Sequence, residues 1–195
     1  MDKDKKILKE KTKEETPPKD VKPLDENPIH VEEKHHEPKH QSSEDEFLSS
    51  ISWGESETDT LVIYCSDHRF QEHFNEFIHK HLLTKPDVLA IPGGPQVLIA
   101  ASYIEKFEWA GRRWVKFLHD KHNLRRIICI AHEDCGWYKN ITIGKLTIPI
   151  LKDRQISDLK KICEALKDMF PKVEVEMWYA DKDGDRVKFS KIKKN

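Results

Sequence analysis

The sequence has little cysteine, almost no net charge and no long apolar run, and each shortage excludes a class of protein. No stretch approaches the ~20 apolar residues that cross a bilayer, and no apolar run of the secretory kind follows the first residues. The formal net charge of −1 gives no basic field that would drive nucleic-acid binding. The four cysteines are too few and too scattered for a disulfide scaffold. We therefore expect a cytoplasmic protein with free thiols that binds neither membrane nor nucleic acid.

The N-terminal segment lacks aromatic residues and is rich in charge. Residues 1–45 hold ten lysines, thirteen acidic residues and five prolines, without one Phe, Trp or Tyr. Such a segment buries too little apolar surface to offset its conformational entropy. We expect residues 1–46 to form a disordered, charged tail and residues 47–195 to form one folded domain.

Within residues 47–195, short apolar runs alternate with segments of helical periodicity. The apolar runs predict strands over residues 60–65, 87–91 and 126–131, and the alternation of apolar and polar residues predicts a fourth strand over 173–179. The helical spacing predicts helices over residues 70–83, 96–120 and 155–169, of which the second could be broken near Gly111. Asp183-Gly184 predicts a turn into a last strand around residues 187–189. The alternation predicts an α/β fold: a mainly parallel sheet flanked by helices, with an antiparallel C-terminal hairpin strand.

Two short polar motifs follow the first and third predicted strands. They read CSDHR over residues 65–69 and HEDCG over residues 132–136. Alone, each is weak, because a cysteine that ends a strand is often a small buried apolar residue. If the two strands are neighbours, the motifs meet at the carboxyl edge of the sheet, where α/β proteins bind ligands. Together they offer two thiolates and one imidazole, which suit zinc and leave a fourth position open.

Asp67 and Arg69 belong to the first motif and lie two residues apart. An arginine held against a carboxylate keeps that carboxylate ionised and oriented. An oriented carboxylate beside a metal-bound water can accept its proton. The alternative is a surface ion pair of little energetic value, which we would favour if the pair did not adjoin a candidate zinc ligand.

The two motifs, Cys-x-Asp-x-Arg and His-x-x-Cys-Gly, together resemble the signature of the β-class carbonic anhydrases, and the likeness extends over residues 60–190. The resemblance implies that Cys65, His132 and Cys135 are zinc ligands and that Asp67 and Arg69 form a catalytic dyad. It also implies reversible hydration of carbon dioxide to bicarbonate, and assembly into a homodimer or a multiple of dimers. In some members of that family the aspartate of the dyad moves onto the metal.

The loop after the second predicted strand departs from the pattern of this family. Residues 91–96 read IPGGPQ, which keeps glycine but lacks the family's Arg/Asn-Ala-Gly-Asn type of run. Gly93 and Gly94 allow close backbone approach and, with the backbone of Gly136, are the candidate substrate contacts. Gln96 could replace the missing polar side chain.

Three functions fit this sequence. The first is a zinc lyase that hydrates carbon dioxide. The second is a related zinc hydrolase acting on carbonyl sulfide or carbon disulfide, in which the same chemistry would serve a differently shaped pocket. The third is a non-catalytic, zinc-binding carbonic anhydrase-like protein whose charged tail makes its contacts.

Overall fold

The computed structural model describes residues 47, 49–99, 105–141 and 148–193. The predicted tail, residues 1–46, lies outside the described residues. Residues from Ser52 onward belong to one unit, and its first regular element begins at Thr60.

A five-stranded sheet forms the centre of this unit. Its strands are β1 (Thr60–Cys65), β2 (Asp87–Ile91), β3 (Arg126–His132), β4 (Glu174–Asp183) and β5 (Arg186–Lys191). They lie in the order β2-β1-β3-β4-β5; all neighbours are parallel except β4 and β5, which are antiparallel. The predicted α/β fold, with a mainly parallel sheet and an antiparallel C-terminal hairpin strand, is confirmed. The strand order also confirms that the first and third predicted strands are neighbours.

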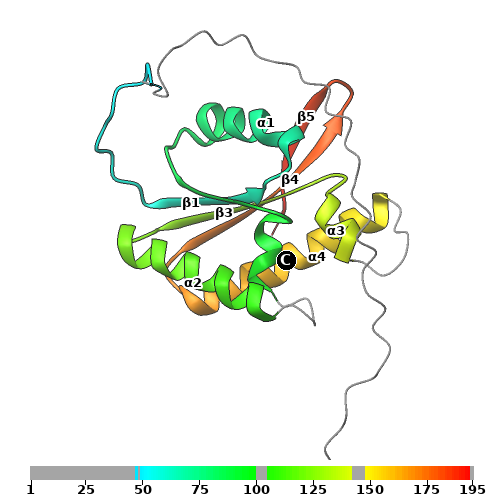
Figure 1. Ribbon diagram of the computed structural model, residues 1–195. Coiled ribbons are helices and arrows are strands. Elements are labelled where there is room, and N and C mark those ends of the chain that lie inside the picture. Colours follow the sequence, from blue (N-terminus) through cyan, green and yellow to red (C-terminus); the bar gives the residue numbers. More distant parts are fainter. Residues whose placement is uncertain (1–46, 48, 100–104, 142–147, 194–195) are drawn as a thin grey trace, which may run out of the picture. The chain divides into compact units, whose positions relative to one another are not determined.

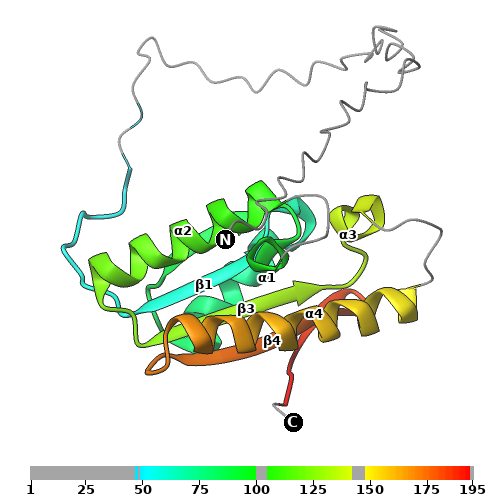
Figure 2. The same ribbon diagram turned by 90° about the horizontal axis from the view of Figure 1, so that it is seen from below.

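Helical segments cover both faces of the sheet (Figures 1 and 2). They are η1 (His68–Phe70), α1 (Gln71–Glu76), η2 (Phe77–Leu82), η3 (Gly94–Leu98), α2 (Glu105–His122), α3 (Gly136–Ile141) and α4 (Ile148–Met169). Segments η1, α1 and η2 pack on one face, and α2 and α4 pack on the other. No helix within the described ranges is both long enough and apolar enough to cross a membrane.

Alternation along the buried strands assigns side chains to the two faces. Leu61 and Ile63 of β1 pack with the α2 and α4 side, whereas Val62 and Tyr64 pack with the α1 side. Strand β3 alternates in the same way, with Ile127 and Cys129 on the first of these faces. Because both faces are buried, the strands appear in the sequence as continuous apolar runs.

Two helix predictions need correction. The possible break near Gly111 does not occur, because α2 continues from Glu105 to His122; the helix predicted over 96–120 is instead interrupted at Ile99, which is extended after η3. A Cβ atom at Gly111 would lie 2.8 Å from Cγ1 of Val97, so this glycine permits close packing of η3 rather than interrupting the helix. The helix predicted over 155–169 begins earlier, at Ile148. Pro149 lies in its first turn, where proline is tolerated because the N–H groups of that turn have no partner within the helix.

Candidate metal centre

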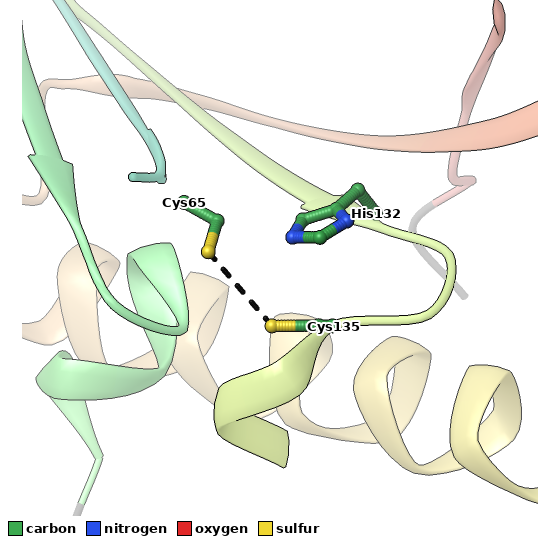
Figure 3. Close-up of side chains that lie close together, drawn as sticks. All are labelled: Cys65, His132 and Cys135. Atoms are coloured by element: carbon green, nitrogen blue, oxygen red, sulfur yellow. Dashed lines mark hydrogen bonds between the residues drawn. The ribbon is translucent and has the colours of Figure 1, made fainter. Parts of the chain in front are cut away.

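Three side chains with metal-binding atoms meet at the carboxyl edge of the sheet. Cys65 is the last residue of β1, His132 is the last residue of β3, and Cys135 directly precedes α3. Because β1 and β3 are neighbouring parallel strands, their ends converge, and the loop after β3 returns Cys135 to the same point (Figure 3). Their ligand atoms all lie within 4.8 Å of one another, and all three residues are buried. The group could hold a metal ion.

His132 is oriented so that one ring nitrogen faces the two sulfur atoms (Figure 3). Its Nδ1 lies 2.7 Å from the backbone oxygen of Glu133, and a carbonyl oxygen only accepts, so Nδ1 carries the proton. In the neutral ring the lone pair is then on Nε2. This buried Nε2 has no hydrogen-bond partner among the described residues. A buried nitrogen without a partner costs free energy, and a metal ion at this point would satisfy it.

The two cysteine sulfurs lie 3.8 Å apart and influence each other's ionisation. The hydrogen bond from the Cys135 thiol and, to a smaller extent, His132 together lower the pKa of Cys65 to about 4. The same hydrogen bond raises the pKa of Cys135, since its proton is shared with the Cys65 thiolate. A thiolate is the form that binds metal, so the site offers one such ligand readily and the second once a cation replaces the shared proton.

Two glutamines hold the backbone of the ligand-bearing strands, and sequence reasoning missed both. The Nε2 atom of Gln71 donates to the backbone oxygens of Cys65 and Asp67, each at 3.0 Å. The buried Gln155 donates to the backbone oxygen of His132 at 3.0 Å and accepts from the Tyr179 hydroxyl at 2.9 Å. Each glutamine fixes one strand end, so helices α1 and α4 both help to place the ligands.

Asp67 and Arg69 form the paired interaction that the sequence suggested. Arg69 donates from Nε to Oδ1 of Asp67 at 3.0 Å and from Nη2 to Oδ2 at 2.6 Å. The backbone N–H of Arg69 also donates to Oδ1, at 3.1 Å, which caps the start of η1. The hydrogen bonds from Arg69 lower the pKa of Asp67 to about 2, so this carboxylate is ionised at neutral pH.

Arg69 also contacts the second motif, which the sequence did not reveal. Its Nη1 donates to Oδ2 of Asp134 at 3.0 Å, and its Nη2 donates to the Asp134 backbone oxygen at 3.1 Å. Lys139 of α3 forms an ion pair with the other carboxylate oxygen of Asp134. Hydrogen bonds from Lys139 and then Arg69 lower the pKa of Asp134. One guanidinium therefore joins the loop after β1 to the loop after β3.

The glycines singled out in the sequence have different surroundings. Gly94 has a φ of 57°, and a Cβ atom there would lie 2.9 Å from the backbone nitrogen of Cys65. Gly93 has a φ of 75°, and a Cβ atom there would overlap the ring of Trp137. The left-handed backbone and the close packing together account for glycine at both positions. Gly136 begins α3, and a Cβ atom there would meet nothing within 4 Å.

An apolar cavity of about 170 Å³ lies beside the cysteine cluster. Trp137 lines it and also packs in the cluster that contains Cys65 and Cys135, and Ile91, another lining residue, is paired with Cys65 across the sheet. Gln96 closes one wall through a 3.1 Å hydrogen bond from the Trp137 indole N–H. The remaining lining residues are Pro92, Val97, Ile99, Phe107, Glu108 and Trp114.

Comparison with known proteins places this geometry in a family. Residues 55–191 match the family model described as "Putative carbonic anhydrase". An uncharacterized protein of Rickettsia bellii (strain RML369-C) is 26% identical over 135 residues, covering 66% of this chain and 80% of that protein. The uncharacterized protein RC0076 of Rickettsia conorii (strain ATCC VR-613 / Malish 7) is 26% identical over 136 residues, covering 66% of this chain and 70% of that protein.

Solved structures similar to this chain include β-carbonic anhydrases. One is from the filamentous ascomycete Sordaria macrospora, with a TM-score of 0.44 and 14% identity over 67% of this chain and 79% of that chain. Another is the carbonic anhydrase of Streptococcus mutans, with a TM-score of 0.44 and 16% identity over 68% of this chain and 81% of that chain. The match to the family model spans residues 55–191, which is more than half of the chain, and it includes both polar motifs. The chain belongs to the putative carbonic anhydrase family.

Proposed function

We propose that this protein is a zinc lyase that reversibly hydrates carbon dioxide to bicarbonate. The observation that carries the proposal is the buried group of Cys65, His132 and Cys135 with an ionised carboxylate two residues after the first cysteine. Two Zn–S bonds of ~2.3 Å at a tetrahedral angle separate their sulfur atoms by about 3.8 Å. The two sulfurs here are 3.8 Å apart, so the two cysteines already have the spacing that zinc requires.

Three protein ligands leave one tetrahedral position for a small molecule, as in catalytic rather than structural zinc sites. When bound, zinc would lower the pKa of a water in that position to ~7, so that hydroxide forms at neutral pH. Asp67 is the residue that would orient this water, because Arg69 holds its carboxylate ionised and fixed in direction. Arg69 acts only through Asp67 in this scheme, as its other contacts are with Asp134.

The apolar cavity supports carbon dioxide as the substrate. Carbon dioxide is small and has no net dipole, so it partitions into apolar space beside a polar centre. Trp137 lines this cavity and also packs against the cluster that contains Cys65 and Cys135. We assign the backbone N–H of Gly136 to bicarbonate, because the first N–H groups of a helix have no partner within the helix.

The test is a stopped-flow hydration assay on zinc-loaded protein. We expect hydration well above the buffer rate for the unsubstituted chain, and about a hundredfold loss of kcat in Asp67→Asn, typical of the removal of a general base. Asp185→Asn is the matched control, since Asp185 is almost fully exposed and its ion-pair contact with Arg186 is at the 4.0 Å limit. One zinc per chain with no hydration above buffer would show a non-catalytic zinc protein. Rapid turnover of carbonyl sulfide or carbon disulfide without carbon dioxide hydration would instead show the related hydrolase.

A homodimer, or a multiple of it, is the assembly that we propose. Helix α2 exposes an aromatic stripe, which we define as Phe107, Trp114 and Phe117, at 50%, 44% and 64% exposure. Strand β2, joined to α2 by a 2.6 Å contact between Asp87 and His122, pairs only with β1 among the described strands. Open strand edges and exposed aromatic stripes mark association surfaces, and a second copy offers the same surface by two-fold symmetry.

Light scattering after gel filtration tests this assembly. We expect a dimer or larger species for the unsubstituted chain and a monomer for Phe117→Glu, because a charge in the centre of an apolar interface would be buried without a partner. Ile150→Glu is the control, since Ile150 is similarly exposed but lies on α4. A monomeric unsubstituted chain would contradict the proposal.

We also assign the protein to the cytoplasm. The structure shows its four cysteines as free, buried thiols, which is the state maintained in reducing compartments. Thiol titration of freshly isolated protein, denatured without reductant, should find all four thiols. A stable disulfide in that material would argue for an oxidising compartment.

A further inference from the structure

We propose that Asp134 is a positioning residue that keeps Asp67 off the metal by anchoring Arg69. The inference rests on the zinc site proposed above and goes beyond it, because it names the residue that decides what occupies the fourth ligand position. Asp134 is not itself a ligand in this scheme. It acts through Arg69, which in turn holds both carboxylate oxygens of Asp67.

Without restraint, Asp67 could itself bind the metal. Carboxylate oxygen is an ordinary zinc ligand, and Asp67 lies only two residues after Cys65. It is therefore a natural competitor for the open position. In the structure, however, the group of ligand atoms within 4.8 Å of one another contains Cys65, His132 and Cys135 and does not include Asp67. Both carboxylate oxygens of Asp67 are instead bonded to Arg69.

Arg69 alone is a weak restraint on Asp67. Its side chain is 40% exposed, and an exposed ion pair is readily exchanged for water. What strengthens it is a second acceptor from a different loop. Asp134 receives Nη1 on its carboxylate at 3.0 Å and Nη2 on its backbone oxygen at 3.1 Å. With acceptors in both motifs, the guanidinium plane is fixed from two directions, and Asp67 is fixed with it.

Asp134 is itself held in place by Lys139. Lys139 pairs with the carboxylate oxygen that Arg69 does not use. The residue has a φ of 59°, a left-handed conformation in which aspartate and asparagine are more common than most side chains. It directly precedes Cys135, so the turn that presents a sulfur to the metal also presents the anchor to Arg69. Binding of a metal by Cys135 and retention of Arg69 are therefore coupled through one turn.

The experiment uses the full chain with cobalt in place of zinc, because the visible spectrum of cobalt reports its ligands. Azide is the probe for an exchangeable fourth position. In the unsubstituted protein, we expect azide to change the cobalt spectrum, and we expect this change to saturate as the azide concentration rises. In Asp134→Gly, which keeps the left-handed backbone but removes the carboxylate, we expect apparent azide affinity to fall about tenfold, as it would if Asp67 filled the position in nine molecules of ten. Asp134→Asn, which can still accept one hydrogen bond, should give a smaller loss.

A double substitution separates competition by Asp67 from general damage. Asp134→Gly combined with Asp67→Asn should regain the azide affinity of Asp67→Asn alone, because the amide is a poor zinc ligand. Unchanged azide affinity in Asp134→Gly would overturn the proposal, as would a loss that persists in the double variant. An unsubstituted protein that binds cobalt but shows no azide response would overturn it too, since Asp67 would already be a ligand. Failure of the unsubstituted protein to bind cobalt at all would instead overturn the metal site under "Proposed function".

Discussion

The four cysteines form two pairs that share burial and differ in chemistry. Cys129 lies in the middle of β3 and Cys163 lies on α4, and both pack in the apolar cluster between the sheet and its helices. Cys65 is the last residue of β1 and Cys135 lies in the loop after β3, and both are close to the imidazole of His132. Burial raises the pKa of Cys129, whereas the hydrogen bond from Cys135 lowers the pKa of Cys65 to about 4. Position relative to the strand ends, and not burial, decides which thiols can bind metal.

The largest effect that we expect is on zinc affinity, when substitution of a cysteine of one pair is compared with substitution of a cysteine of the other. Cys65→Ser or Cys135→Ser should weaken zinc binding by about a hundredfold or more, because thiolate ligation supplies much of the affinity. Cys163→Ala should keep one zinc per chain and lower the free energy of unfolding by about 1 kcal/mol through the small cavity it leaves. Chelator competition and urea unfolding measure the two quantities. Equal zinc loss in Cys163→Ala would erase the distinction between the pairs.

Substitution of Gln155 tests whether the end of β3 must be held by a side chain for Cys65, His132 and Cys135 to bind metal. Gln155→Leu leaves the backbone oxygen of His132 and the Tyr179 hydroxyl without their partner, which should cost about 2 kcal/mol of unfolding free energy. Zinc affinity should fall about tenfold, as for other residues that orient a ligand. Gln71→Leu is the comparison, since Gln71 is only half-buried and its effect on unfolding should be smaller. Full zinc affinity in Gln155→Leu would show that β3 fixes His132 unaided.

A third effect, on stability alone, separates backbone strain from crowding at the strand end. Gly94 and Gly184 both have left-handed φ values, 57° and 63°. A Cβ atom at Gly94 would meet the backbone of Cys65, whereas one at Gly184 would meet nothing within 4 Å. Gly184→Ala should therefore cost only the conformational term, about 1 kcal/mol, and Gly94→Ala about 1–3 kcal/mol more. Chemical denaturation of both variants gives the difference directly, and equal losses would refute close packing at Cys65.

The smallest effect should follow deletion of residues 1–45. The family match begins at residue 55, and the composition of the deleted segment favours disorder. We expect the melting temperature of the zinc-loaded protein to change by less than about 2 °C, on the basis that the segment buries little apolar surface. A fall of several degrees in a thermal scan would mean that the segment contributes to the fold.

Much of the fold could be predicted because β1 and β3 are continuous apolar runs with polar ends, whereas β4 and β5 contain alternating polar and apolar residues. The predicted strand 87–91 agrees with β2, and β1 and β3 are neighbours, which is the condition under which the two motifs were expected to meet. The suggested break near Gly111 is absent because a glycine can either interrupt a helix or allow close packing, and only the position of Val97 distinguishes the two. That information lies in tertiary structure and not in the local pattern.

The candidate site was predictable in its ligand group and not in its supports. Cys65, His132 and Cys135 stand in short motifs whose residue types carry the chemistry. Asp134 was visible inside such a motif, but its contact with Arg69 joins residues 65 apart, and its left-handed backbone leaves no mark in the sequence. Gln155 lies within a helix among many polar residues, and only its burial against the end of β3 gives it a role.

The separation of Cys65 and Cys135 along the chain has a consequence for how the protein unfolds. The two residues are 70 positions apart, and an ion shared between them would close a loop of that length, as a covalent cross-link does. By chain-entropy reasoning such a closure restricts the unfolded chain by roughly 4 kcal/mol. Metal supply would then govern the stability of the fold as well as its chemistry, and a chelator would weaken both.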